Sequence, residues 1–349
     1  MRRNRVPLTT GSRRPAAAPE HPDEHELWAD SMPPRTRIEI GFVNNMPDAA
    51  LAATERQFSR LIEQASGDLD INISLYTLES LPRQPGTLSA IGQTYRPARE
   101  LRAHSPDALI VTGAEPHAPD LRDEPYWGEL AGLAEWAQSH TISCLFSCLA
   151  AHAEVLRRDK IVRRRQPIKL HGVFEAEVVA SHELVEGLGA RASIPHSRYN
   201  GLDEGELAAK GYVTLTLSCE GGVDMFVLEE ENLSVFLQGH PEYDADTLAR
   251  EYRRDVQRFM SSKQSAPPLP PRDYFPPAVA ARVAAWVERS SNGVPSAFPP
   301  EALLQGEAAW RAASVRLFRN WLAAVARRKA AQSAPTLSAA QCERQSRPK

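Results

Sequence analysis

The chain has few cysteines and no excess of charge of either sign. Its 349 residues include four cysteines, at positions 144, 148, 219 and 342, and no two of them form a CxxC pair. This spacing argues against a disulfide framework and against a cysteine zinc site. The formal net charge of −3 provides no strongly basic surface, so nucleic acid is not an expected partner.

Long hydrophobic runs are also missing. No apolar run approaches the roughly 20 residues that span a bilayer, and no apolar signal-peptide core follows the arginines near the N-terminus. We therefore expect a cytoplasmic protein without a membrane partner. Hydrophobic residues make up 42% of the chain, which is enough for a large core in one or two domains.

Short apolar strands alternate with helical segments along much of the chain. Strands are predicted at 38–43, 107–113 and 141–146, and segments with helical spacing or composition lie between them. This order predicts an α/β fold with a mostly parallel central sheet flanked by helices. Between 160 and 235 the apolar segments indicate a more antiparallel, meander-like part of the sheet.

The two ends differ in composition from the rest of the chain. Residues 1–36 are rich in Arg, Pro, Ala and acidic residues without an apolar period, which predicts a flexible tail. Residues 37–328 are expected to form the folded domain, in which 263–328 provide a Pro-rich arm and a C-terminal helix. Residues 329–349 are expected to be disordered.

A cysteine lies where a predicted strand turns into a helix. In TISCLFSCLAAHAEVL, residues 141–156, the first half favours a buried strand and the second half favours a helix. Cys148 stands between them and faces the positive end of the helix dipole, which favours a thiolate nucleophile. The alternative is that Cys148 is a small buried hydrophobic residue.

A histidine occupies an equivalent place at the end of another strand. LSVFLQGHPEY, residues 233–243, is an apolar strand that runs into His240, with Glu242 two residues further on. Ligands of parallel sheets bind beyond the carboxyl ends of the strands, so Cys148 and His240 are expected at one site. A cysteine nucleophile needs a base and the base needs an orienting group, which predicts these roles for His240 and Glu242. The alternative is a surface turn.

Several longer segments carry a family resemblance. They span about residues 37–325 and include NNMPDAALAATERQF, LIVTGAEP, EPYW, LFSCLAAHA, KLHGVFE, IPHSRY and GHPEYDADTLAREYRRD, with DYFP and NWL nearer the C-terminus. With these segments the chain resembles the homoserine O-succinyltransferase, or homoserine O-acyltransferase, family. The resemblance implies the fold of class I glutamine amidotransferases and makes 37–328 an acyltransferase domain.

The resemblance implies an acyl-CoA-dependent O-acyltransferase of methionine biosynthesis. Its co-substrate would be succinyl-CoA or another acyl-CoA, its acceptor a hydroxy amino acid such as homoserine, and it would need no cofactor or metal. Cys148 would take the acyl group as a thioester, and His240, oriented by Glu242, would then deprotonate the acceptor hydroxyl. The oxyanion would be held by the N–H of Cys148 or Leu149 and by the loop at 45–47.

Four further residues match substrate-binding positions of the family. Lys169 in IKLHG is implied to bind substrate, and Ser197 in PHSRY is implied to contact the acyl donor. Glu251 and Arg254 lie three residues apart on a predicted helix, hence on one face. The resemblance implies that they bind the ammonium and carboxylate groups of the acceptor. The alternatives are an exposed lysine and a solvated helical ion pair.

Departures from the family pattern indicate a divergent member. Asp48 follows the MP motif where the family usually has a lysine nearby, and Leu149 follows the nucleophile where Trp is frequent. His117 falls at the position where Gly accompanies succinyl donors and Glu accompanies acetyl donors, so it is the expected specificity residue. Arg122 and Arg198 are candidates to pair with the free carboxylate of a succinyl group, which favours the succinyl donor.

Other functions are compatible with the same residues. A homoserine or serine O-acetyltransferase would differ in the donor or the acceptor. A glutamine amidotransferase or cysteine hydrolase would use the same three catalytic residues, and a binding or regulatory protein would use none of them. The sequence does not identify the acyl donor, the acceptor or the assembly, for which a homodimer is one expectation.

Overall fold

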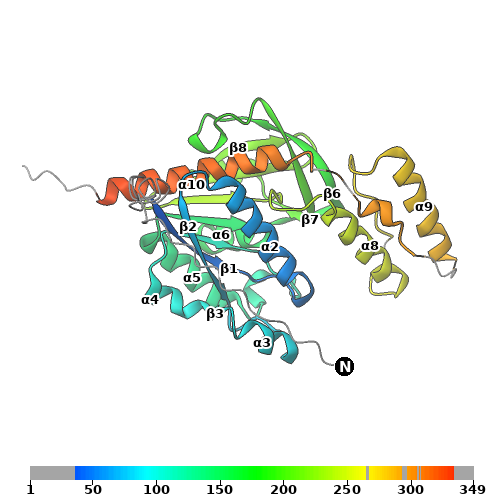
Figure 1. The fold of residues 1–349 in the computed structure, drawn as a ribbon, viewed down its shortest axis with the longest axis horizontal. Helices are drawn as coiled ribbons and strands as arrows, with labels where there is room; N and C mark the ends of the chain where they lie inside the picture. Colours follow the sequence, from blue (N-terminus) through cyan, green and yellow to red (C-terminus); the bar gives the residue numbers. More distant parts are fainter. Residues whose placement is uncertain (1–35, 265–266, 293–296, 305, 307, 334–349) are drawn as a thin grey trace, which may run out of the picture. The chain divides into compact units, whose positions relative to one another are not determined.

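A ten-stranded sheet forms the centre of the computed structural model, which describes residues 36–264, 267–292, 297–304, 306 and 308–333 (Figure 1). The strand order is β3-β2-β1-β4-β5-β10-β9-β8-β6-β7. The strands are β1 (Arg37–Val43), β2 (Asp70–Thr77), β3 (Arg96–Pro97), β4 (Ala108–Val111), β5 (Ser143–Ser147), β6 (Arg164–Val178), β7 (Arg191–Gly201), β8 (Val213–Ser218), β9 (Gly222–Glu229) and β10 (Leu233–Leu237).

The sheet has a parallel half and an antiparallel half. All neighbours from β3 to β10 pair in parallel, whereas β10, β9, β8, β6 and β7 pair antiparallel. The expected α/β fold with a largely parallel sheet and a more antiparallel part is thus confirmed. β5 and β10 are parallel neighbours, and their last residues, Ser147 and Leu237, lie opposite each other. The segments that follow these two strands therefore start side by side.

Helices cover both faces of the sheet. One hydrophobic core packs α5 and α6 against the sheet, and a second packs α2 and α10 against its other face. No helix in the described ranges combines the length and the apolarity that a membrane span needs. The helices are α2 (Asp48–Ala65), α3 (Pro85–Ile91), α4 (Leu101–His104), α5 (Trp127–His140), α6 (Leu149–Asp159), α7 (Glu204–Ala208), α8 (Thr247–Met260), α9 (Pro277–Ser291) and α10 (Arg311–Ser333).

The two cores follow from the alternation of side chains along each strand. Leu109 and Val111 of β4 join the core under α5 and α6, while Ile110 between them joins the core under α2 and α10. In β5, Phe146 joins the core under α5 and α6, and Leu145 joins the core under α2 and α10. Successive side chains of a strand point to opposite faces, so a strand buried on both faces must be apolar throughout. This explains why β4 and the central residues of β5 appear in the sequence as continuous apolar runs.

The Pro-rich arm contains a helix that the sequence analysis did not identify. Within 263–328, α9 begins at Pro277, where proline suits the first helical turn because its missing N–H has no intrahelical partner there. Trp286 of α9 packs in a small core with Tyr252 and Val256 of α8. The prolines around 276 obscured a segment whose later residues are mainly Ala, Val, Arg and Glu.

The C-terminal helix is longer than expected. α10 extends to Ser333, so residues 329–333, which were predicted to belong to a disordered tail, are helical. The Lys329 ammonium pairs with the Asp107 carboxylate at 2.7 Å and ties this last part of the helix to the end of the loop before β4. Residues 334–349, and the expected flexible tail up to residue 35, lie outside the described residues.

Candidate active site

Cys148 forms a sharp turn between β5 and α6. Its backbone has φ 53° and ψ −111°, in the left-handed range that a residue with a Cβ adopts at a cost of about 1–3 kcal/mol. The Cys148 N–H donates to the Leu237 carbonyl of β10 at 2.7 Å, which continues the pairing of the two strands into the turn. The structure thus places the predicted nucleophile at the strand-to-helix turn, half-buried.

Two glycines after neighbouring strands allow close packing around the site, Gly113 against the Cys148 turn and Gly239 against β9. A Cβ on Gly113, just after β4, would lie 3.0 Å from the Leu149 backbone nitrogen. A Cβ on Gly239, just after β10, would lie 2.5 Å from Oδ1 of the buried Asp224. The Gly239 N–H also donates to this Asp224 oxygen at 3.1 Å. Asp224 and Gly239 therefore fix the backbone that carries His240.

His240 lies between Cys148 and Glu242. Its Nδ1 is 2.8 Å from Oε1 of Glu242, and its side chain also hydrogen-bonds to the Cys148 sulfur. The ring stacks on Tyr243 with centroids 4.3 Å apart. His240 and Glu242 are buried. His240 is thus joined to both of the other residues predicted to act with it, and its Nδ1 is held by Glu242 so that Nε2 is left for the sulfur.

The surroundings of His240 favour its charged form. Burial alone lowers the pKa of His240, but the negative charges of Glu242 and Cys148 and their hydrogen bonds outweigh it, so the pKa is raised well above its ordinary value. At neutral pH the ring therefore carries a proton. A cationic imidazolium beside Cys148 stabilises a thiolate, the nucleophilic form of cysteine.

The expected oxyanion donors need a correction. The Cys148 N–H is committed to Leu237, and in the 45–47 loop the N–H groups of Asn45 and Met46 donate to Thr112 and Asn44, while residue 47 is a proline. Leu149, the first residue of α6, has an N–H without an intrahelical partner. The Leu149 N–H is therefore the remaining member of the expected set that can hold an oxyanion.

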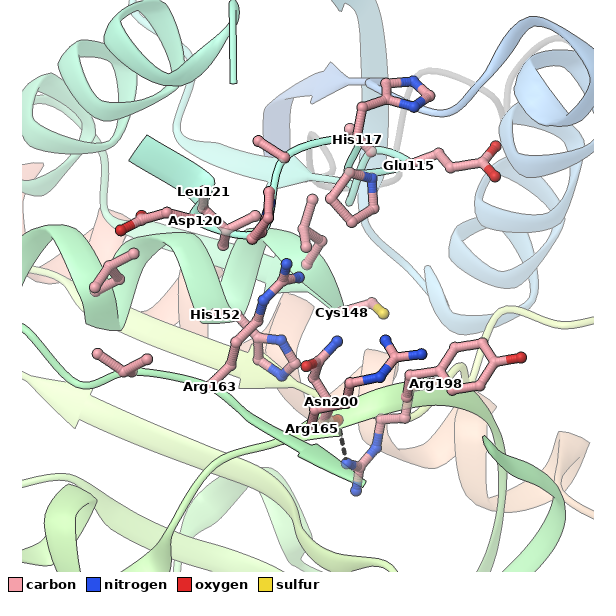
Figure 2. Close-up of a pocket in the computed structure, with 18 of the residues that line it drawn as sticks. Glu115, His117, Asp120, Leu121, Cys148, His152, Arg163, Arg165, Arg198 and Asn200 are labelled. Carbon is pink, nitrogen blue, oxygen red and sulfur yellow. Dashed lines mark hydrogen bonds between the residues drawn. The ribbon is translucent and has the colours of Figure 1, made fainter. Parts of the chain in front are cut away.

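A pocket of about 920 Å³ opens beside Cys148 (Figure 2). It is lined by the loop at 114–122, the first turns of α6, the residues around the start of β6, and 197–200 of β7. Four arginines and the sulfur of Cys148 share this lining, so the pocket suits an anionic substrate. In the described part of the chain, no group of three or more His, Cys, Asp or Glu side chains is arranged to hold a metal ion.

Ser197 lines this pocket together with Cys148. Its hydroxyl is 3.2 Å from Nδ1 of His171 on the neighbouring strand β6. Burial and, after it, the charge of Lys169 lower the pKa of His171 to about 4, so this imidazole is neutral at physiological pH. Ser197 is thereby oriented by a neutral group at the lining of the pocket.

The other three predicted substrate residues form a charged cluster between β6 and α8. The Lys169 ammonium is 2.7 Å from Asp255, and Nε of Arg254 donates to the second oxygen of the same carboxylate at 3.0 Å. Glu251 lies 3.9 Å from Arg254 and accepts from the Tyr243 hydroxyl at 3.1 Å. Because Tyr243 also stacks on His240, the charged cluster adjoins His240 and its contacts with Glu242 and Cys148.

Asp255 was missed by the sequence analysis, although its spacing carries the signal. It lies four residues after Glu251, on the same face of the helix. Burial raises the pKa of Asp255, but Lys169 and Arg254 outweigh it and the pKa is lowered. The pKa of Glu251 is also lowered, because the same two cations outweigh its burial. Both carboxylates are therefore ionised, and the cluster has two positive and two negative members.

His117 lies on the exposed rim of the pocket. Its backbone N–H donates to Oε1 of the buried Glu124 at 2.5 Å, and the Ala118 N–H donates to the same oxygen at 2.6 Å. Glu124 therefore fixes the loop backbone at the expected specificity position.

The two arginines proposed for a succinyl carboxylate are already engaged. Arg122 is exposed and binds both carboxylate oxygens of Asp120. The buried Arg198 donates to the carbonyls of Asn200, at 2.6 Å, and Gly221. Charge alone marks an arginine as a candidate in the sequence, whereas the groups that already bind it are visible only in the fold.

Comparison with known proteins identifies relatives over nearly the whole described chain. The model of the family described as homoserine O-succinyltransferase matches residues 33–331. The homoserine O-succinyltransferase of Methylorubrum extorquens is 45% identical over 303 residues, which cover 85% of this chain and 90% of that protein. The homoserine O-succinyltransferase of Rhodopseudomonas palustris is 43% identical, covering 89% and 95%.

Solved structures with a similar course of the chain are more distant. A glutamine amidotransferase from Thermotoga maritima is 14% identical, covers 83% of this chain and 98% of its own, and has a TM-score of 0.47. A glutamine amidotransferase from Methylobacillus flagellatus is also 14% identical, with coverages of 84% and 96% and a TM-score of 0.47.

Proposed function

The chain belongs to the homoserine O-succinyltransferase family, and from this we propose that it transfers a succinyl group from succinyl-CoA to the hydroxyl of homoserine. The family is one of acyltransferases in methionine biosynthesis. The observation that carries the proposal is the contact of Cys148, His240 and Glu242 beside a large cationic pocket. We place the reaction in the cytoplasm, where a thiol nucleophile stays reduced.

In the first half-reaction the Cys148 thiolate attacks the thioester carbonyl of succinyl-CoA. A new carbon–sulfur bond forms, and the carbonyl oxygen becomes an oxyanion that faces the Leu149 N–H. The bond to the CoA sulfur then breaks, and the leaving CoA thiolate takes the proton of the His240 imidazolium. The products are free CoA, a succinyl thioester on Cys148 and a neutral His240.

In the second half-reaction His240 acts as a base. Acylation removes the negative charge of Cys148, one of the groups that raise the pKa of His240, so this pKa falls and the neutral ring is favoured. Neutral His240 takes the proton of the acceptor hydroxyl, whose oxygen attacks the Cys148 thioester. The Cys148–carbon bond breaks, the thiolate returns and pairs with the imidazolium, and O-succinylhomoserine leaves.

The charged cluster on α8 suits an amino-acid acceptor. Glu251 offers a carboxylate to the α-ammonium group, and Arg254, with Lys169 nearby, offers cations to the α-carboxylate. Both charges of the acceptor must be answered because an unpaired charge in a partly dry site is costly. Tyr243 joins Glu251 to the ring of His240, so an acceptor held here has its side-chain hydroxyl near the base.

The proposed function is tested by separating the two half-reactions. The protein is incubated with succinyl-CoA, acetyl-CoA or glutamine, and intact mass reports any adduct. Homoserine, serine or water is then supplied as acceptor. We expect a succinyl adduct that homoserine discharges to O-succinylhomoserine. Ammonia release from glutamine without acyl-CoA would instead support the amidotransferase alternative, and an acetyl adduct alone would support the acetyltransferase.

We expect Arg254→Ala to raise the KM for homoserine about 10- to 100-fold, the effect of losing a charge-assisted hydrogen bond. Formation of the acyl-enzyme should change little, because the acceptor takes no part in it. Half-reaction kinetics measure both effects. Arg250→Ala is the matched control on the same helix, since Arg250 is exposed and pairs with Asp246. Equal losses in both half-reactions of Arg254→Ala would contradict this role.

A further inference from the structure

Among the four arginines that line the pocket, Arg163 differs from the others in the partners of its guanidinium group. Arg122 is paired with Asp120, the donors of Arg198 are taken by backbone carbonyls, and Arg165 stacks over the Tyr199 ring at 4.9 Å. The Arg163 guanidinium has no hydrogen bond or ion pair to any described residue. A guanidinium presents five N–H donors in a planar fork, so this group is available to a ligand.

Arg163 extends into the pocket beside Cys148. Figure 2 shows its side chain running from the segment before β6 toward the loop that carries Asp120 and Leu121. The side chain is half-buried, and it lies close enough to Cys148 for their charges to interact. An unpaired cation in this partly desolvated position is expected to be matched by an anionic group of the substrate.

Glu124 is the carboxylate whose charge acts on Arg163, and one of its two oxygens is engaged elsewhere. Its Oε1 accepts from the N–H groups of His117 and Ala118, and it forms no ion pair with Arg163. Its charge still favours the charged form of the guanidinium, which burial disfavours. The guanidinium of Arg163 thus lines the pocket without a hydrogen-bond or ion-pair partner among the described residues.

We propose that Arg163 binds the free carboxylate of the succinyl donor and so selects dicarboxylic acyl groups. This inference rests on the proposed function and names the residue that recognises its donor. The free carboxyl carbon of a succinyl group lies three carbon–carbon bonds from the thioester carbon, about 4 Å. The phosphates of CoA are separated from that carbon by the whole pantetheine arm. A cation beside Cys148 therefore matches the succinyl carboxylate.

The test compares two donors that differ only in the charged group. Succinyl-CoA and butyryl-CoA both carry a four-carbon acyl chain, and only the first ends in a carboxylate. Acylation of Cys148 without acceptor is followed by intact mass and CoA release for wild type, Arg163→Met, Arg163→Gln and Arg163→Lys. Arg122→Met is the matched control, because it removes the same charge from the same pocket lining.

We expect Arg163→Met and Arg163→Gln to lower the acylation kcat/KM for succinyl-CoA about 10- to 100-fold and to leave that for butyryl-CoA nearly unchanged. Arg163→Lys should restore part of the preference, because it keeps the charge and loses the fork. Arg122→Met should retain the wild-type preference. The butyryl-CoA rate of each variant shows that its site is folded.

Equal losses for the two donors would overturn the inference, because Arg163 would then serve the thiolate or CoA rather than the acyl carboxylate. The inference would also be overturned if Arg122→Met lost the preference for succinyl-CoA while the Arg163 variants kept it. The proposed function fails separately if the wild-type protein forms no succinyl adduct on Cys148. If the adduct forms and Arg163→Met makes it as fast as wild type, only the inference about Arg163 is wrong.

Discussion

Replacement of Cys148 by alanine is expected to abolish both the acyl adduct and turnover, a loss of about 10⁴-fold or more. The thioester needs this sulfur, and the turn places it where His240 and the pocket meet. Intact mass after incubation with succinyl-CoA, without acceptor, measures the adduct, and CoA release with homoserine measures turnover. An adduct that persists in Cys148→Ala would refute the proposed nucleophile.

The other described cysteines provide the controls. Cys144 lies inside β5, where burial, and after it the charge of Glu154, raises the pKa of its thiol well above the ordinary value. It is thus an inert part of the core. Cys219 is exposed and does not line the pocket. We expect Cys144→Ala to lose activity modestly through packing and Cys219→Ala to keep it, with one adduct per chain in both variants.

Replacement of His240 by alanine is expected to slow turnover by about 10²- to 10⁴-fold, the range for a positioned acid-base group. In the proposed mechanism His240 gives its proton to the CoA sulfur and later accepts the proton of homoserine, so both half-reactions should slow. Single-turnover acylation and discharge of the preformed acyl-enzyme measure them separately. Wild-type rates in both steps would rule out His240 as the proton carrier.

His152, a second buried imidazole in the pocket, provides a matched control for His240. Its Nε2 is 2.9 Å from Gln238, and burial lowers its pKa to about 3, so the ring is uncharged at neutral pH. No carboxylate of the described residues is paired with this ring. His152→Asn is expected to cost at most a few-fold in rate.

The proposed role of Glu242 predicts the direction in which the pH dependence of acyl-enzyme discharge shifts. Glu242 raises the pKa of His240, so Glu242→Gln should lower it. Discharge of the acyl-enzyme requires neutral His240, and the rate rises with pH as the ring loses its proton. In Glu242→Gln this rise should therefore move to lower pH, while the plateau rate falls. A rise that moves to higher pH would contradict the assigned role of Glu242.

The positions of Cys148 and His240 at strand ends could be predicted from the sequence because they depend on local signals. An apolar strand followed by Cys148, and another followed by Gly239 and His240, place both side chains at carboxyl ends of a sheet. The adjacency of β5 and β10 makes these two ends meet, and the sequence carries no signal of that pairing. The family resemblance, rather than any periodicity, brought Lys169 and Ser197 into the prediction.

The parts that could not be predicted depend on long-range partners. Arg163 stands in a run of three arginines, and nothing in the sequence separates it from Arg164, which binds Asp203 and Glu206. Arg122 has the same charge as Arg163, but Asp120 two residues away neutralises it. Which cation is free for a ligand is decided by burial and by the course of the loops, both of which are properties of the folded chain.

The left-handed backbone of Cys148 has a consequence for the evolution of the protein. A glycine at this position would relieve the conformational cost, so selection for stability alone favours losing the nucleophile. The surrounding strands must supply the compensating free energy at all times, even when no substrate is present. Proteins near their stability threshold tolerate few further losses of this kind. We expect lineages that no longer need the reaction to discard this cysteine before they lose the fold.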